Sequence, residues 1–285
     1  MSNFRVLSAS QLTTYATCTQ QWAYRYAEKA PEESRSGALV LGSAVDVALK
    51  TLVHQVRSGE ATVGTVKPKE LLHEAWGAET SSKPEVPIDW GEKGAPANLR
   101  TAEALVEAFA RLPDLEQRIA RIVSVDLRFE LPVLDPRTEQ PAPGLGVQGI
   151  LDFVERDADG KLRALDLKTA GSRAGWSPDD TRWHVQGSVY AWALKELHGD
   201  AAAEDVAFHI GFKLKEPVWE DRVVNLPAAA RRRVLLSLIA ASQSMDRATP
   251  FPQKSWACAG CAYSRRCDDW QSTPGVVLRR DPFAA

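Results

Sequence analysis

The residues best suited to do chemistry lie between Gly146 and Ala170, in the stretch GVQGILDFVERDADGKLRALDLKTA. Three charged residues interrupt its two apolar runs, namely Asp152, Asp166 and Lys168. Two neighbouring carboxylates repel each other unless a cation lies between them. Mg²⁺ or Mn²⁺ would accept oxygens from both and leave coordination positions for water and a phosphate. A lysine beside such an ion could activate the water or neutralise charge on the phosphate, so these residues predict metal-assisted hydrolysis of a phosphodiester.

A hairpin of two short strands is needed to bring these side chains together. The sequence Asp157-Ala158-Asp159-Gly160 has the chemistry of the turn, because glycine accepts a positive φ. Side chains alternate along a strand, so Asp166 and Lys168 lie on one face. A three- or five-residue loop places Asp152 opposite Asp166, with Cβ atoms roughly 5 Å apart. The alternative is an ordinary hairpin whose charged residues face solvent, and Asp-x-Lys alone does not decide between the two.

The chain has four cysteines, Cys18, Cys258, Cys261 and Cys267, and the last three form a C-x2-C-x5-C cluster. A disulfide framework is not expected, because the N-terminus shows no secretory signal. Four thiolates suit a structural Zn²⁺ site or an iron–sulfur cluster. One pair of cysteines joined by a wider-spaced and a remote cysteine favours a [4Fe–4S] cluster over zinc. Four unrelated buried thiols are the remaining alternative.

Length and composition set the broad class. A chain of 285 residues with 44% hydrophobic and 25% charged residues is typical of a soluble globular protein of one large or two small domains. No apolar run approaches 18 residues, so no membrane association is expected and a cytoplasmic location is predicted. The net charge of −2 argues against a wholesale coat of nucleic acid, but it allows a local basic groove.

Several further elements are predicted along the first half of the chain. A helix that starts at Ser8 or Ser10 and continues to about Tyr26 would carry Cys18. A second helix is expected from Ala38 to about Val56. Residues 59–98 are rich in Gly, Pro, Lys and Glu, and are interpreted as an insertion or flexible excursion with a short helix near Lys69–Trp76. Helices are then expected from Ala97 to Leu112 and on to Ile122, followed by a strand from Val123 to Val133 that pairs antiparallel with the hairpin.

The second half of the chain supplies a helix, a second hairpin and the cysteine segment. The helix expected from Arg182 to Leu197 carries Gln186 and Tyr190 one turn apart, so the two side chains are neighbours. The second hairpin comprises Val206–Lys215 and Val218–Leu226, a helix follows from Pro227 to about Met245, and the cysteine cluster lies in residues 249–270.

In this order the motifs resemble the PD-(D/E)XK nuclease superfamily. More narrowly, the chain resembles the RecB-like iron–sulfur branch, which includes the CRISPR-associated adaptation nucleases and the nuclease domain of AddB. The G-x2-D, (D/E)-x-K and Q-x3-Y motifs of that branch are matched by Gly149-Ile-Leu-Asp152, Asp166-Leu-Lys168 and Gln186-Gly-Ser-Val-Tyr190. One cysteine before these motifs and three after them complete the pattern, from about Leu7 to Trp270.

The resemblance implies one restriction-endonuclease-like α/β domain over residues 1–285. Its central sheet would be mixed and mostly antiparallel and would be flanked by helices. The cysteine-ligated cluster would join the N-terminal helix to the C-terminal tail.

One motif departs from the family pattern. The family has G-x3-H on the second helix, where His is a metal ligand, but this chain has Gly42-Ser-Ala-Val-Asp46. A carboxylate can take that coordination position and suits Mg²⁺ or Mn²⁺. The alternative is that the loss of His marks a weakened site.

The activity that the resemblance implies is divalent-metal-dependent hydrolysis of DNA, as an exonuclease on single strands or ends. Asp46, Asp152, Asp166 and the backbone carbonyl of Leu167 would hold the metal, and Lys168 would act on the water or the phosphate. Gln186 and Tyr190 would contact the DNA backbone or fix Lys168. Protein partners in DNA repair, recombination or CRISPR adaptation are possible for such a nuclease.

Two other classes of function remain open from the sequence. The first is a catalytically weak DNA-end-binding or adaptor protein that keeps the fold and the cluster. The second is a zinc-stabilised binding module.

Overall fold

A six-stranded mixed sheet forms the centre of the protein, whose computed structural model describes residues 5–177, 181 and 184–272. Its strands are β1 (Arg5–Leu7), β4 (Ile122–Asp135), β5 (Gln140–Arg156), β6 (Leu162–Ala170), β7 (Ala202–Phe212) and β8 (Val218–Asn225). The strand order is β1-β5-β6-β7-β8, with β4 also paired to β5. β1 runs parallel to β5 and β7 parallel to β6, whereas the other pairs are antiparallel. The predicted mixed sheet is confirmed.

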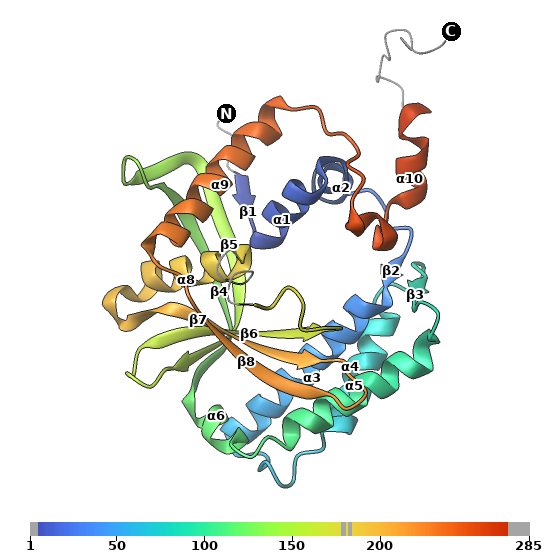
Figure 1. Cartoon of the computed structure of the whole chain (residues 1–285), viewed down its shortest axis with the longest axis vertical. Coiled ribbons are helices and arrows are strands. Elements are labelled where there is room, and N and C mark those ends of the chain that lie inside the picture. Colours follow the sequence, from blue (N-terminus) through green and yellow to red (C-terminus); the bar gives the residue numbers. More distant parts are fainter. Residues whose placement is uncertain (1–4, 178–180, 182–183, 273–285) are drawn as a thin grey trace.

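Helices cover both faces of this sheet, and each face has its own apolar core (Figure 1). One core is shared with α1 (Ala9–Thr17), α8 (Val185–His198) and α9 (Ala228–Arg247). The other is shared with α3 (Gly37–Ser58), α4 (Pro68–Ser81), α5 (Gly94–Ala110) and α6 (Leu115–Arg121). The smaller elements are α2 (Thr19–Trp22), a π-helical turn (Ala23–Ala27), α10 (Ser264–Asp268), and a two-stranded sheet of β2 (Arg35–Ser36) and β3 (Ile88–Asp89).

The long helix α3 follows the predicted boundaries and packs one apolar face into the core. Leu49 and Leu52 on this face are fully buried. Gly42 lets the helix approach β6, because a Cβ at this position would lie 3.3 Å from Thr169 Oγ1. α3 is also long and apolar enough to cross a membrane, which the sequence analysis did not expect. Half of its most apolar 18-residue window is buried inside the protein. A core helix of a soluble protein can have the same length and composition.

The predicted continuous helix from Ser8 or Ser10 to Tyr26 is wrong, because the backbone breaks at Cys18. Cys18 is extended, with φ −158° and ψ 111°, and it ends α1. Its Sγ accepts a hydrogen bond from the backbone N–H of Gln21 at 3.4 Å, so the same residue caps the start of α2. A side chain that can cap a helix competes with continuation of the helix through it.

Residues 59–98 contain a longer helix than the sequence suggested. α4 extends from Pro68 to Ser81 and packs against α3 and α5, with Leu72 fully buried. Trp76 stacks on Trp90 with ring centroids 5.1 Å apart. The interpretation of this stretch as an insertion stays a prediction. Further along, α8 begins at Val185, and the predicted helix start at Arg182 lies outside the described residues.

The hairpin of β5 and β6 has the predicted turn. Asp157 Oδ1 accepts hydrogen bonds from the backbone N–H groups of Asp159 and Lys161, at 3.0 and 2.8 Å. Gly160 has the positive φ, 78°, that this turn requires. The paired register ends at Phe153 and Leu165, and its continuation by one position would set Asp152 across from Asp166.

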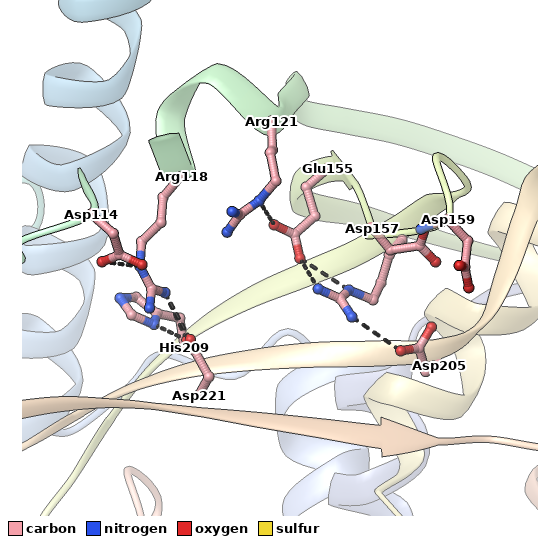
Figure 2. Close-up of polar contacts among 10 residues, drawn as sticks. Asp114, Arg118, Arg121, Glu155, Asp157, Asp159, Asp205, His209 and Asp221 are labelled. Carbon is pink, nitrogen blue, oxygen red and sulfur yellow. Dashed lines mark hydrogen bonds and ion pairs between the residues drawn. The ribbon is translucent and has the colours of Figure 1, made fainter. Parts of the chain in front are cut away.

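A network of ion pairs joins α6 to the sheet on the α3 side (Figure 2). Arg163 lies 2.7 Å from buried Glu155 and 3.1 Å from Asp205, which links β5, β6 and β7. A second group joins Arg118 of α6 to Asp114 and Asp221, and Asp221 also binds Nδ1 of the buried His209. These contacts pair charges that would be costly to bury alone.

Candidate active site

Asp152, Asp166 and Lys168 lie together on the paired strands β5 and β6. Asp166 is completely buried, and the Lys168 Nζ lies 2.5 Å from its Oδ2. Asp152 Oδ2 accepts a hydrogen bond from the backbone N–H of Leu167 at 2.9 Å. In the part of the chain that the structure describes, neither oxygen of Asp166 accepts a well-aligned hydrogen bond. A buried carboxylate needs positive charge beside it, which the Lys168 ammonium supplies at Oδ2 and a metal ion would complete.

The electrostatics of the site also favour a cation. Burial raises the pKa of Asp166 to about 7; the charge of Lys168 opposes this shift and that of Asp152 adds to it. Burial, followed by repulsion from Asp152, raises the pKa of Asp46 to about 6. Each shift means that the negative charge is destabilised where it stands, so additional positive charge would stabilise both carboxylates.

Lys50 was not among the predicted site residues, yet its ammonium lies at the centre of the acidic group. Its Nζ is 2.8 Å from oxygens of Asp46, Asp126 and Asp152, which come from α3, β4 and β5. Burial lowers the pKa of Lys50, but the charges of Asp152 and Asp46 outweigh that effect and raise it. Asp126 was also missed. The spacing of Asp46 and Lys50, four residues apart on one helix, was the available signal.

The side chains of the three acidic residues predicted to bind the metal, Asp46, Asp152 and Asp166, are not gathered around one point. Asp46 and Asp152 meet through Lys50, whereas Asp152 and Asp166 lie opposite each other on neighbouring strands. Within residues 5–177, 181 and 184–272, no group of three or more His, Cys, Asp or Glu side chains is arranged to hold a metal ion. Their shared metal therefore stays a prediction. Carboxylates and the carbonyl of Leu167 nevertheless form a donor set of hard oxygens. Among the described residues, the oxygens of the buried Asp166 have the Lys168 ammonium beside them but accept no well-aligned hydrogen bond, so the residues fit Mg²⁺ or Mn²⁺.

Gln186 and Tyr190 support the strand that carries Asp152. The hydroxyl of Tyr190 donates to the carbonyl of Ile150 at 2.5 Å, and Gln186 Nε2 donates to that hydroxyl at 2.7 Å. Gly149 has a packing role beside them, because a Cβ there would lie 2.6 Å from the ring of Phe129. The hydrogen bonds of this pair fix β5; neither of them reaches Lys168.

A cleft of about 1020 Å³ adjoins the site along β5. The cleft is not lined by Asp152, Asp166 or Lys168. Gly149 and Ile150, which precede Asp152 on β5, line it together with Tyr190 and so connect it to the site. Its other lining residues are mostly polar: Ser8, Ser10, Thr13, Thr14, Arg128, Glu130, Gln148, His184 and Gln186. His184 was missed by the sequence analysis. Burial, and then the charge of Lys168, lowers the pKa of His184 to about 4, so its ring is neutral at pH 7.

The four cysteines line one cavity of about 400 Å³ between α2 and the C-terminal segment: Cys18, Cys258, Cys261 and Cys267. All are free thiols. Burial raises the pKa of Cys261 and of Cys267, and the neighbouring cysteines add to both shifts. The fold thus brings the remote Cys18 to the other three. Among the described residues, however, these thiols are not arranged around a single metal ion.

The family model and one solved structure agree with this architecture. The family model of the PD-(D/E)XK nuclease superfamily matches residues 6–268. No curated protein matches the sequence. Among solved structures, the chain is similar to the protein described as "Putative exonuclease" from Eubacterium rectale, with 14% identity and a TM-score of 0.52 over 93% of this chain and 88% of that one. It also matches SSO0001, with 10% identity and a TM-score of 0.38 over 90% of this chain and 96% of that one.

The raised pKa of Asp166 predicts how stability changes with pH in the metal-free protein. The folded-state pKa of about 7 exceeds the unfolded value, so the folded state binds the extra proton, and Asp166 makes the protein less stable as the pH rises from about 4 to about 7. Asp166→Asn removes this effect. We expect the stability of the variant relative to the wild type to rise over that range, by roughly 4 kcal/mol in total, because each unit of the pKa shift corresponds to about 1.4 kcal/mol.

Urea unfolding in EDTA between pH 4.5 and 8 measures this difference. Asp159→Asn, in the exposed hairpin turn, is the control and should follow the wild-type curve. A difference between Asp166→Asn and wild type that does not change with pH would contradict the assignment.

Proposed function

Because the chain belongs to the PD-(D/E)XK nuclease superfamily, we propose that it is a divalent-metal-dependent deoxyribonuclease. The observation that carries the proposal is the buried Asp166, which faces Asp152 across the hairpin and has Lys168 at its side. A nuclease of this superfamily implies DNA as the substrate and Mg²⁺ or Mn²⁺ as the ion. We further propose exonucleolytic action on single strands or DNA ends.

In this proposal the carboxylates of Asp152 and Asp166 and the carbonyl of Leu167 bind the ion, and Asp46 completes the set. The bound ion would supply Lewis-acid activation of the phosphodiester and lower the pKa of water. Lys168 lies beside Asp166, and its side chain is about one quarter exposed, at 28%. Its ammonium can therefore turn to the phosphate or the attacking water, where a positive charge stabilises the developing negative charge.

The cleft along β5 is the proposed path of the DNA backbone. One of the Ser8 and Ser10 hydroxyls, the amides of Gln148 and Gln186, and Arg128 can donate hydrogen bonds to phosphate oxygens, whereas the Thr13 and Thr14 hydroxyls already donate to backbone carbonyls. Contacts of this kind hold a strand without reading its bases. Tyr190 and Gln186 then act mainly by fixing the position of Ile150, two residues before Asp152.

A second candidate function is a DNA-end-binding or adaptor protein with weak catalysis. The specific observation in its favour is Lys50, whose ammonium lies between carboxylates that a nuclease would use for metal. Asp46 in place of the family's histidine is consistent with it. The intact set of Asp152, Asp166 and Lys168 favours the nuclease.

We also propose that the four cysteines bind a [4Fe–4S] cluster, as in the RecB-like iron–sulfur nucleases that the sequence resembles, with Zn²⁺ as the alternative. The supporting observation is the shared cavity that brings Cys18 to Cys258, Cys261 and Cys267. A cluster held there would tie α2 to the C-terminal segment and stabilise the fold by closing a long loop. Cytoplasmic location, and partners in repair, recombination or CRISPR adaptation, stay predictions.

The nuclease proposal predicts that Lys168→Ala lowers the rate of DNA degradation by about 10²-fold or more, because it removes the positive charge beside the scissile phosphate. The measurement is digestion of end-labelled single-stranded and duplex DNA with Mg²⁺ or Mn²⁺. Lys195→Ala, in an exposed ion pair with Asp200, should leave the rate unchanged. Equal activity of Lys168→Ala and wild type, or no metal-dependent cleavage by the wild type, would favour the adaptor function.

The cluster proposal predicts a brown protein after anaerobic purification, with an absorbance band at about 400 nm and about four irons per chain. Cys267→Ser should lose the iron and the colour, because three thiolates remain. A colourless wild-type protein that contains zinc would show that the site is a zinc site.

A further inference from the structure

Lys50 has an environment that an ordinary helix ion pair does not explain. Its ammonium carries three donors and lies 2.8 Å from one oxygen of each of three carboxylates, those of Asp46, Asp126 and Asp152. The side chain is only 13% exposed. An ordinary i,i+4 ion pair would involve only Lys50 and Asp46 of α3. Here Asp126 of β4 and Asp152 of β5 contact the same ammonium. The ammonium therefore occupies a cation position built from three separate elements.

The backbone of Asp126 is bent to reach this position. Asp126 has φ 51°, in the left-handed region, although it lies inside β4 between Val125 and Leu127, which pair with Phe153 and Leu151. A non-glycine residue rarely adopts this conformation, and such outliers gather where the surroundings hold them for a purpose. The register also places Asp126 across from Asp152, where two like charges would be unfavourable without a cation between them.

The same group of carboxylates overlaps the proposed metal ligands. Asp46 and Asp152 both contact Lys50, and both belong to the set proposed to bind the divalent ion. An ion that used these oxygens would stand close to the ammonium, and the two positive charges would repel. Asp126 is half exposed, and within the described part of the chain its only ion pair is with Lys50, so it can keep the ammonium after the other two oxygens are taken.

We propose that Lys50 is an internal counter-cation, which holds Asp46, Asp126 and Asp152 together in the metal-free protein and competes with the divalent ion for Asp46 and Asp152. Lys50 is thus a positioning residue whose charge sets how tightly the metal binds. It accounts for the observation that the described acidic side chains do not surround a common metal position: the lysine holds two of them. The identity of the ion rests on the proposed nuclease function.

The test compares Lys50→Met with the wild type. Methionine keeps an unbranched side chain and removes the charge. Mn²⁺ binding is followed by electron paramagnetic resonance of the free ion, and the melting temperature is measured with EDTA and with Mn²⁺. We expect Lys50→Met to bind Mn²⁺ about tenfold more tightly or better, because the competing charge is gone.

The melting temperatures give an independent readout. In EDTA the Lys50→Met variant should melt below the wild type, because three carboxylates then repel without a counter-charge, and Mn²⁺ should restore most of the loss. Lys50→Gln is the second variant: it is neutral but keeps two donors, and it serves if the methionine variant does not fold without metal. Lys195→Met, which breaks an exposed pair with Asp200, is the control and should change neither quantity.

The outcomes separate this inference from the proposed function. Neutral Lys50 variants that bind Mn²⁺ no more tightly than the wild type overturn the inference, even if the wild type cleaves DNA. Tighter binding in these variants, with no DNA cleavage by any protein, supports the inference and contradicts the nuclease. Absence of Mn²⁺ binding in both the wild type and the neutral variants overturns the two together.

Discussion

The structure around the site depends on one electrostatic constraint: Asp152 and the completely buried Asp166 lie on neighbouring strands of one hairpin, close enough for the charge of Asp152 to raise the pKa of Asp166. Two such charges are stable only with positive charge beside them. Each carboxylate has a lysine ammonium beside it: Lys50 lies next to Asp152, and Lys168 lies next to Asp166. Burial nevertheless raises the pKa of Asp166, so the negative charge is only partly compensated there, and a divalent cation would stabilise it further.

The fold meets this constraint by fixing the strands from both sides. Tyr190 holds the Ile150 carbonyl on one face of the sheet, and α3 brings Asp46 and Lys50 to the opposite side of β5 and β6. Gly42 allows the close approach of α3 to Thr169, where a Cβ would make a tight contact, and Gly149 leaves room for the ring of Phe129. Two glycines of the nuclease-like motifs therefore have steric roles in positioning the acidic residues.

Much of this arrangement could be predicted from the sequence because it follows local rules. Strand alternation and the turn at Gly160 predicted Asp152 across from Asp166, and the observed register, which ends one position earlier at Phe153 and Leu165, is consistent with it. Lys50 and Asp126 could not be found in that way. From the sequence, Lys50 is expected to form an ordinary i,i+4 ion pair with Asp46. Asp126 is expected to be a solvent-facing polar residue of an alternating strand. Their convergence depends on a left-handed backbone and on contacts between distant elements. The break at Cys18 was missed because apolar spacing continues through it.

The most direct test of the central claim, that Asp152 and Asp166 share a divalent cation, is a crystal structure of the wild-type protein with Mn²⁺, examined by anomalous scattering. The account predicts a manganese peak at coordination distance, about 2.2 Å, from oxygens of Asp152 and Asp166 and from the Leu167 carbonyl, with the Lys50 ammonium moved away from Asp46. A structure at saturating Mn²⁺ with no peak between these carboxylates, and with Lys50 still bound to Asp46 and Asp152, would contradict it.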